Sequence, residues 1–170
     1  MLKARTVALA FILLTGAAAS GTSTQQRKED PLDALKFLEG VWHGEGKSPY
    51  GPYEFEARNE RRGRWMLGTS AIYAPGTNQV LVTAAGLIGY DDKGVLMYAF
   101  DNAGVTIFRG ETADGGVRFE WKDGESHRRR TLLRLDGGRI SNREESYLPG
   151  VSKEKIVFES ISLPGKRDSK

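Results

Sequence analysis

Few residues in this chain are suited to acid-base, nucleophilic or metal chemistry. There are two histidines, His43 and His127, and no cysteine. Nucleophilic catalysis needs a base beside the nucleophile and a third group that orients the base. Neither a Gly-x-Ser-x-Gly elbow nor a His-Glu-x-x-His motif is present, and two isolated histidines do not have the spacing of a metal site. We therefore predict no catalytic residue and no metal site, and a non-enzymatic protein is favoured.

Adjacent polar residues do not form a shared site if the chain is extended at these positions. Glu144 and Glu145 have the residue types of an acid-base pair, but neighbouring residues of a strand point to opposite faces. One carboxylate is therefore expected inside and one outside. In the same way, if Trp42 fills an interior, its neighbour His43 faces solvent.

Arginine is frequent in the second half of the chain, and alternation divides each cluster between two faces. Arg128, Arg130 and Arg134 share one face. An inward arginine needs a partner, which would be an inward glutamate or the carboxylate of a bound amphiphile. A solvated outer face is favoured for the arginines, and a ligand contact is the alternative. Acidic residues are interleaved with the basic ones, so no nucleic-acid partner is expected.

Aromatic residues are the best indication of a binding site. Phe119 and Trp121 share one face of an alternating stretch with Val117. In a barrel the core and the wall of a pocket are the same surface, so some of these rings would contact a ligand. An arginine or tyrosine near the mouth would hold the polar end of that ligand. The predicted ligand-binding residues are Trp42, Trp65, Phe100, Trp121, Tyr147 and Arg128.

The positions of these residues depend on a series of short strands. From Val41 onward, runs of period two are separated by Gly-, Asp- and Asn-rich turns, which predicts about ten strands in hairpin sequence. Parallel pairing would need crossover helices, and none is indicated after Gly40. We predict an all-β, antiparallel up-and-down barrel, with a two-sheet sandwich as the alternative. After the strand that begins at Val41, the expected strands are 53–61, 65–73, 79–90, 95–100, 105–109, 117–122, 127–135, 139–147 and 155–163.

One of these expected strands has an unusual composition. Residues 79–90 are almost continuously apolar. Such a run is typical of a strand that is buried on both faces or that crosses the barrel wall.

The first thirty residues differ from the rest. Lys3 and Arg5 precede an apolar run and then small residues, so residues 1–20 are interpreted as a secretory signal peptide. The apolar run is short for a membrane span, which needs about 20 residues, so no stable membrane insertion is expected. Removing this segment takes away two basic residues and no acidic one, which lowers the net charge from +3 to +1. The mature protein is expected in the periplasm or outside the cell.

After the predicted signal peptide, we expect three parts: a polar N-terminus, one barrel domain and a short tail. Residues 21–30 are polar and are predicted to be a flexible N-terminus. Asp30 followed by Pro31 is a helix-start signal, and a two-turn helix is expected over 31–39, ended by Gly40. One barrel domain is predicted over residues 31–164, and residues 165–170 form a polar tail that is expected to be loose.

Three motifs in order resemble a known group of proteins. The segment Gly40-Val41-Trp42-His43-Gly44-Glu45-Gly46 is similar to the Gly-x-Trp-x-Gly-x-Gly opening of lipocalin-like (calycin) barrels. The stretches 86–91 (Gly-Leu-Ile-Gly-Tyr-Asp) and 97–104 resemble a bacterial family of unknown function within that group. The related nitrobindins bind haem through a late-strand histidine. No histidine follows His127, so haem and other cofactors are not expected, although His127 is a conceivable substitute.

The resemblance implies a function by analogy with the fold only. We expect an exported barrel that binds a small apolar or amphipathic molecule in its interior. One alternative is a barrel filled by its own side chains that acts as an interaction module in the cell envelope. Another is a hydrolase or isomerase with a polar interior, which would need an inward carboxylate or histidine with a perturbed pKa. The interior volume discriminates between the first two.

Overall fold

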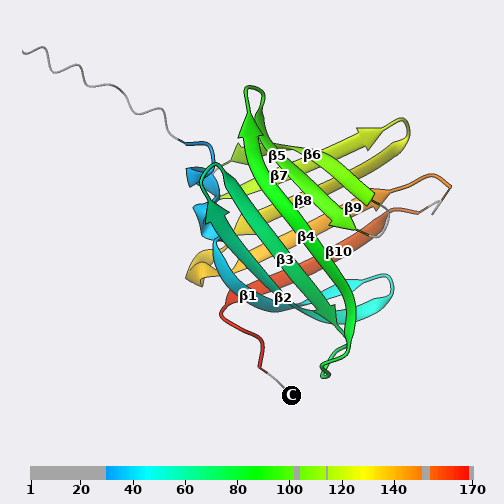
Figure 1. Ribbon diagram of the computed structural model, residues 1–170. Helices are drawn as coiled ribbons and strands as arrows, with labels where there is room; N and C mark the ends of the chain where they lie inside the picture. Colours follow the sequence, from blue (N-terminus) through cyan, green and yellow to red (C-terminus); the bar gives the residue numbers. More distant parts are fainter. Residues whose placement is uncertain (1–29, 102–103, 114, 151–153, 169–170) are drawn as a thin grey trace, which may run out of the picture.

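The chain folds into one closed antiparallel β-barrel of ten strands (Figure 1). This computed structural model describes residues 30–168 except 102–103, 114 and 151–153. The predicted signal peptide, residues 1–20, lies outside the described residues. The predicted all-β barrel is confirmed, and the two-sheet sandwich is excluded because the first strand pairs with the last.

The strands follow one another around the barrel, and each pairs with its neighbours in the chain. They are β1 (Gly40–Ser48), β2 (Gly51–Arg62), β3 (Trp65–Tyr73), β4 (Val80–Asp91), β5 (Gly94–Asp101), β6 (Gly104–Ala113), β7 (Gly116–Asp123), β8 (Ser126–Arg134), β9 (Ile140–Tyr147) and β10 (Ile156–Pro164). The turn of η2 (Asp136–Gly138), a short 3₁₀ segment, joins β8 to β9. Closure leaves no unpaired strand edge.

A short helix closes one end of the barrel. The predicted two-turn helix over 31–39 is a 3₁₀ helix, η1 (Asp33–Leu38), so it is tighter and shorter than expected. The predicted capping role of Asp30 is wrong, because the N-cap of η1 is Leu32; the side chain of Asp30 instead accepts a hydrogen bond of 2.9 Å from the Leu32 N–H in the turn before the helix. Leu32, Leu35 and Leu38 are buried in the core. No helix in the described part of the chain is long and apolar enough to cross a membrane.

The Trp42 motif joins this helix to the barrel. The indole Nε1–H of Trp42 donates to the Leu38 carbonyl oxygen at 3.0 Å, and Asn59 Nδ2 donates to the same oxygen at 2.8 Å. The last turn of η1 is therefore held by both β1 and β2. A Cβ added at Gly44 would overlap the carbonyl oxygen of Ile161 on β10, so this glycine permits the close approach that seals the barrel.

Two sequence expectations were wrong in detail. The apolar stretch 79–90 is not buried on both faces, because Val80, Leu81 and Val82 are all exposed. The C-terminal tail is fixed as far as Arg167: the backbone N–H of Arg167 donates to Glu56, and its guanidinium pairs with Glu54 at 2.7 Å. Residues 169–170 lie outside the described residues.

Candidate functional site

The barrel encloses a cavity of about 470 Å³. Leu38 and Trp42 form its floor, next to the helix that closes the barrel. The rest of its lining comes from inward positions of β2, β3, β4 and β5 on one side and of β8, β9 and β10 on the other. Ligand sites in proteins commonly have volumes of about 300–1,000 Å³. The interior is therefore large enough for one small molecule.

Side-chain size decides where the lumen is open. Large buried side chains from β5, β6 and β7, among them Met97, Phe108 and Phe119, pack the core on one side. Six of the inward residues of β2–β5 that line the cavity are small: Ala57, Gly68, Ser70, Ala84, Gly86 and Ala99. These residues do not reach across the barrel, so the lumen is filled on one side and hollow on the other.

A buried ion cluster lies on the cavity wall opposite the small residues. Arg130 Nε donates to Glu144 at 2.8 Å, and a second nitrogen of Arg130 contacts the same carboxylate oxygen. Arg128 contacts the other carboxylate oxygen at 3.2 Å and lies against the Phe108 ring. Pairing across the β8–β9 hairpin places Arg130 directly opposite Glu144. Two cations thus share one anion, and the cluster carries one net positive charge.

Electrostatics keep this cluster ionised. Burial alone would raise the pKa of Glu144, but the charges of Arg130 and Arg128 outweigh burial and lower it. The Glu144 carboxylate in turn raises the pKa of Arg130, against the effect of burial. The Arg130 side chain keeps 36% of its surface accessible, and Arg130 is among the residues that line the cavity. A positive group is therefore available to the interior of the barrel.

Neutral polar groups extend the cluster toward β2 and β10. Asn142 Nδ2 donates to the Ser160 hydroxyl at 3.4 Å, while the buried Asn142 Oδ1 has no hydrogen-bond partner among the described residues. Burial raises the pKa of the Tyr53 hydroxyl, although a hydrogen bond with Ser160 opposes this shift. Tyr53 is therefore neutral, and its hydroxyl donates to the Glu159 carbonyl oxygen at 3.4 Å. The site combines a positive centre with hydrogen-bonding groups on an otherwise apolar surface.

The depressed pKa of Glu144 predicts a pH dependence of stability. A carboxyl whose pKa is lower in the folded state stabilises fully above its unfolded pKa of about 4.3, and this stabilisation is lost as the pH falls through the folded value. We expect the free energy of unfolding to be nearly constant from pH 7 to 5 and to fall steeply below pH 4. Urea unfolding at pH 7, 5, 4 and 3 measures this dependence. In Glu144→Gln, the free energy of unfolding should fall less steeply below pH 4. An unchanged slope in that variant would contradict the assignment.

The predicted ligand-binding residues do not all face the cavity. Trp42 and Arg128 line it. Trp121 is half-buried and packs against the core, but it is not part of the cavity wall. Trp65, Phe100 and Tyr147 occupy outward positions, next to the inward Met66, Ala99 and Ser146. The Trp65 ring covers Gly89 and makes an edge contact with Tyr98 at 6.3 Å between ring centroids.

Sequence reasoning named Arg128 as a ligand-binding residue but did not name Arg130 or Glu144. The solvated outer face favoured for the arginines is wrong for Arg128 and Arg130, because both side chains line the cavity and pair with Glu144 of β9. Counting residues outward from the turn Asp136-Gly137-Gly138 pairs Arg130 with Glu144, so the signal was present in the hairpin. Glu144 inside and Glu145 outside agrees with the expected alternation.

Neither histidine lines the cavity. His43 lies on the outer face, where Nδ1–H donates to the Lys166 carbonyl at 2.8 Å. His127 is half-buried near the mouth, adjacent in sequence to the inward Arg128 and paired with Tyr147. In the described ranges, no group of three or more residues could hold a metal ion.

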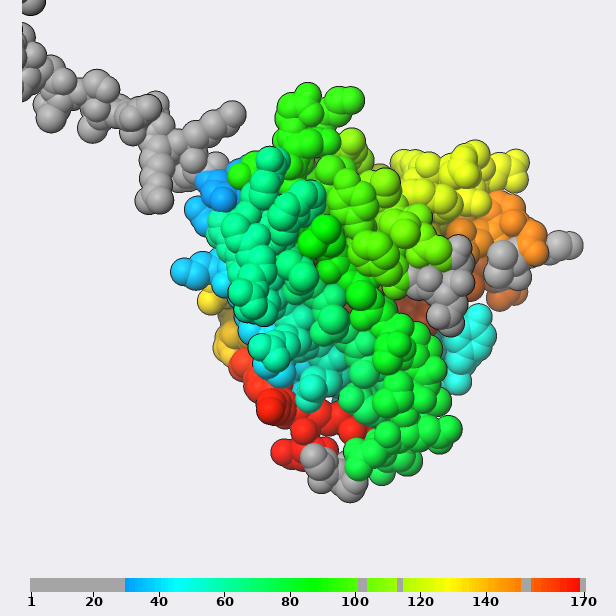
Figure 2. Space-filling model, viewed as in Figure 1, coloured from blue at the N-terminus to red at the C-terminus, as the bar shows by residue number. Residues whose placement is uncertain are grey.

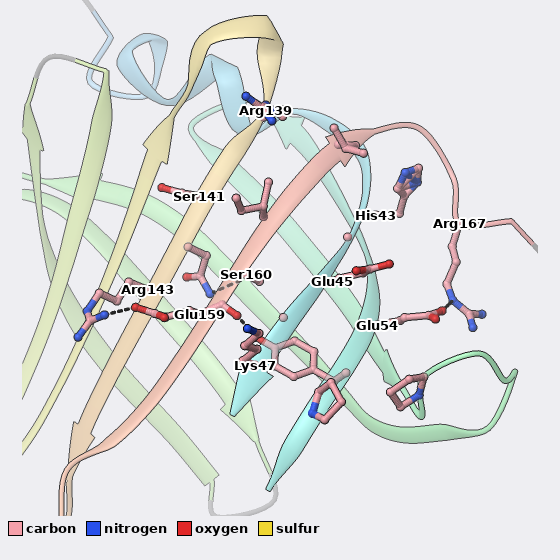
Figure 3. Close-up of a pocket in the computed structure, with 18 of the residues that line it drawn as sticks. His43, Glu45, Lys47, Glu54, Arg139, Ser141, Arg143, Glu159, Ser160 and Arg167 are labelled. Atoms are coloured by element: carbon pink, nitrogen blue, oxygen red, sulfur yellow. Dashed lines mark hydrogen bonds and ion pairs between the residues drawn. The ribbon is translucent and has the colours of Figure 1, made fainter. Parts of the chain in front are cut away.

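A second hollow, of about 1,120 Å³, lies mainly outside the barrel across β1, β2, β9 and β10 (Figure 3). Its charged side chains are of both signs, and several already pair with one another, as Arg143 does with Glu159 and Arg167 with Glu54. Exposed ion pairs in an open groove add little to the binding of a small ligand, whereas a cavity inside the barrel can surround it. The interior cavity is therefore the candidate site.

Comparison with known proteins supports the fold. No protein-family model and no curated protein matches the chain. Among solved structures, it is similar to the crystal structure of Rv2717c from M. tuberculosis, with a TM-score of 0.62 and 16% sequence identity. The match covers 81% of this chain and 99% of that one. The two proteins share the closed antiparallel barrel fold. At this identity the likeness concerns the fold alone.

Proposed function

We propose that this calycin-like barrel binds one small amphipathic molecule in its interior. The observation that carries the proposal is the cavity of about 470 Å³, which has small apolar residues on one wall and the Arg128–Glu144–Arg130 cluster on the other. A lumen packed completely by its own side chains would have favoured a purely structural interaction module.

The polar end of the ligand is anionic in this proposal. The cluster has one net positive charge, and its guanidinium groups match the planar, two-oxygen geometry of a carboxylate. Asn142 and Tyr53 offer further hydrogen bonds beside it. The apolar body of the ligand lies against Trp42 and the small residues of β2–β5. Glu144 is a poor general base, because two arginines lower its pKa, so the site supports binding better than catalysis.

Family and location are part of the same proposal. The Gly-x-Trp-x-Gly-x-Gly opening at Gly40–Gly46 supports membership of the bacterial lipocalin-like family of unknown function. The leader at residues 1–20 supports export, with the ligand taken up in the periplasm or outside the cell. The proposal requires no cofactor.

A variant that fills the cavity tests the proposal. The amphipathic anion 1-anilinonaphthalene-8-sulfonate is titrated into the mature protein, and its fluorescence gives affinity and stoichiometry. We expect one probe per chain, and a loss of at least tenfold in affinity for Ala84→Phe, whose ring would occupy the space beside Gly86.

The matched control is Leu163→Phe on the exposed outer face of β10. It should leave probe binding unchanged. Equal binding to Ala84→Phe and to the wild type, with both variants folded by circular dichroism, would show that the probe does not enter the lumen.

A further inference from the structure

The charge inside the barrel is small and is confined to one cluster. Of the described residues that line the cavity, only Arg128, Arg130 and Glu144 carry a charge. Because these two arginines pair with the same glutamate, their cluster has one net positive charge. An anionic group that enters the cavity therefore meets one positive charge that the cavity wall does not already balance.

The negative member of the cluster is held in place at both of its oxygens. Glu144 Oε1 accepts from Arg128 at 3.2 Å, and Glu144 Oε2 accepts from Arg130 Nε at 2.8 Å. Glu144 is also buried, with 9% of its surface exposed, and it lies opposite Arg130 in the β8–β9 pairing. A carboxylate bound in this way does not turn away when a ligand enters. The net charge that the ligand meets is therefore set by all three side chains.

The opposite wall of the lumen adds no charge. β3 and β4 stand opposite β8 and β9 in the order of ten strands around the barrel. In Figure 2 the residues of β3 and β4 (teal to green) lie on the side turned toward the viewer, in front of β8 and β9. The cavity residues of β3 and β4 are all uncharged, among them Gly68, Ser70, Ala84 and Gly86. This wall therefore cannot balance a second negative charge on a ligand.

We propose that Glu144 restricts the lumen to ligands with a single negative charge, such as carboxylates, sulfonates and sulfate esters, and disfavours dianions such as phosphate monoesters. This inference rests on the proposed function, binding of an amphipathic anion in the lumen. The attraction to the cluster grows in proportion to the charge of the ligand, whereas the cost of removing a charge from water grows with its square.

The balance of charge makes Glu144 a specificity-determining residue. One negative charge on the ligand neutralises the cluster, and a second would be buried without a partner. Without Glu144, the two arginines would present two positive charges, which match a dianion. A glutamate between two arginines thus selects against the ligand with the higher charge.

Two octyl compounds of matched shape test this proposal. Octyl sulfate and octyl phosphate share the same chain and a tetrahedral head, but at pH 8 the sulfate ester has one negative charge and the phosphate monoester nearly two. Isothermal titration calorimetry of the mature protein at pH 8 measures both affinities. We expect the wild type to bind octyl sulfate about tenfold more tightly than octyl phosphate, and Glu144→Gln to lose this preference.

The matched control is Glu145→Gln. It removes the same charge from the adjacent residue, whose carboxylate pairs with Lys155 on the outer face, and it should keep the preference of the wild type. Circular dichroism at the temperature of the titration checks that Glu144→Gln is folded. The triple variant Arg128→Met, Arg130→Met, Glu144→Leu gives a second measurement. With no charge in the lumen, it should bind octyl sulfate about tenfold more weakly than the wild type but bind octanol equally well.

Three results would overturn the proposal. Equal affinity of the wild type for octyl sulfate and octyl phosphate would show that the lumen binds anions of either charge, and the proposed function would stand. Loss of the preference in Glu145→Gln as well as in Glu144→Gln would assign it to the charge of the whole molecule. Failure of octyl sulfate, octyl phosphate and octanol to bind the wild type would overturn the proposed function together with this inference.

Discussion

Glu144→Gln should lower the free energy of unfolding by about 2–3 kcal/mol at pH 7, because it leaves the partly buried Arg128 and Arg130 side by side without their anion. Glu144 is only 9% exposed, so water cannot replace the lost charge. Urea denaturation followed by tryptophan fluorescence measures the change.

The control for this prediction is the adjacent residue. Glu145→Gln removes a carboxylate that pairs with Lys155 at 2.7 Å on the outer face, and it should change stability by no more than about 1 kcal/mol. The triple variant Arg128→Met, Arg130→Met, Glu144→Leu should recover most of the stability lost in Glu144→Gln, since an apolar replacement leaves no unpaired charge. Equal effects of Glu144→Gln and Glu145→Gln would show that the cluster is not buried as described.

Trp42→Ala is expected to have a second large effect, a loss of about 3–5 kcal/mol. The Trp42 side chain fills the floor of the lumen, and its indole N–H holds the last turn of η1. Its removal leaves a hole beneath the ligand cavity and frees the helix that closes the barrel. Thermal unfolding and urea denaturation measure the loss.

Two further tryptophan substitutions separate packing from hydrogen bonding. Trp42→Phe keeps a large ring but loses the bond to Leu38, and we expect a cost of about 1–2 kcal/mol. Trp65→Ala removes a ring of the outer face, where solvent already reaches it, and should cost less than half as much as Trp42→Ala. A larger loss for Trp65→Ala than for Trp42→Ala would contradict the assignment of Trp42 to the closed end.

The strands were predictable because their signals are local. Apolar alternation and glycine-rich turns gave residues 65–73 and 139–147, and the structure has Trp65–Tyr73 and Ile140–Tyr147. An unbroken series of hairpins also predicts a closed meander, since any open edge would be a liability. Trp42 was expected inside the barrel because it is the one aromatic residue in the glycine-rich stretch Gly40–Gly46. Its side chain lines the cavity.

The site was less predictable because side-chain direction depends on the whole barrel. Trp65 and Phe100 lie in strands that are apolar on both faces, so hydrophobicity does not reveal which face is inside. Arg128 and Arg130 are inward only because Glu144 meets them from the next strand. Glu144 is 14 positions from Arg130 and 16 from Arg128 in the sequence. These ion pairs can therefore be predicted only when the register of the β8–β9 hairpin is known.

The position of a bound probe tests the central claim most directly. A crystal structure of the mature protein with 1-anilinonaphthalene-8-sulfonate should show the naphthalene ring between Trp42 and the small residues of β2–β5. The sulfonate should lie about 3 Å from a guanidinium nitrogen of Arg128 or Arg130. A probe found only on the outer face of β3–β6, with the lumen occupied by protein side chains, would contradict the account.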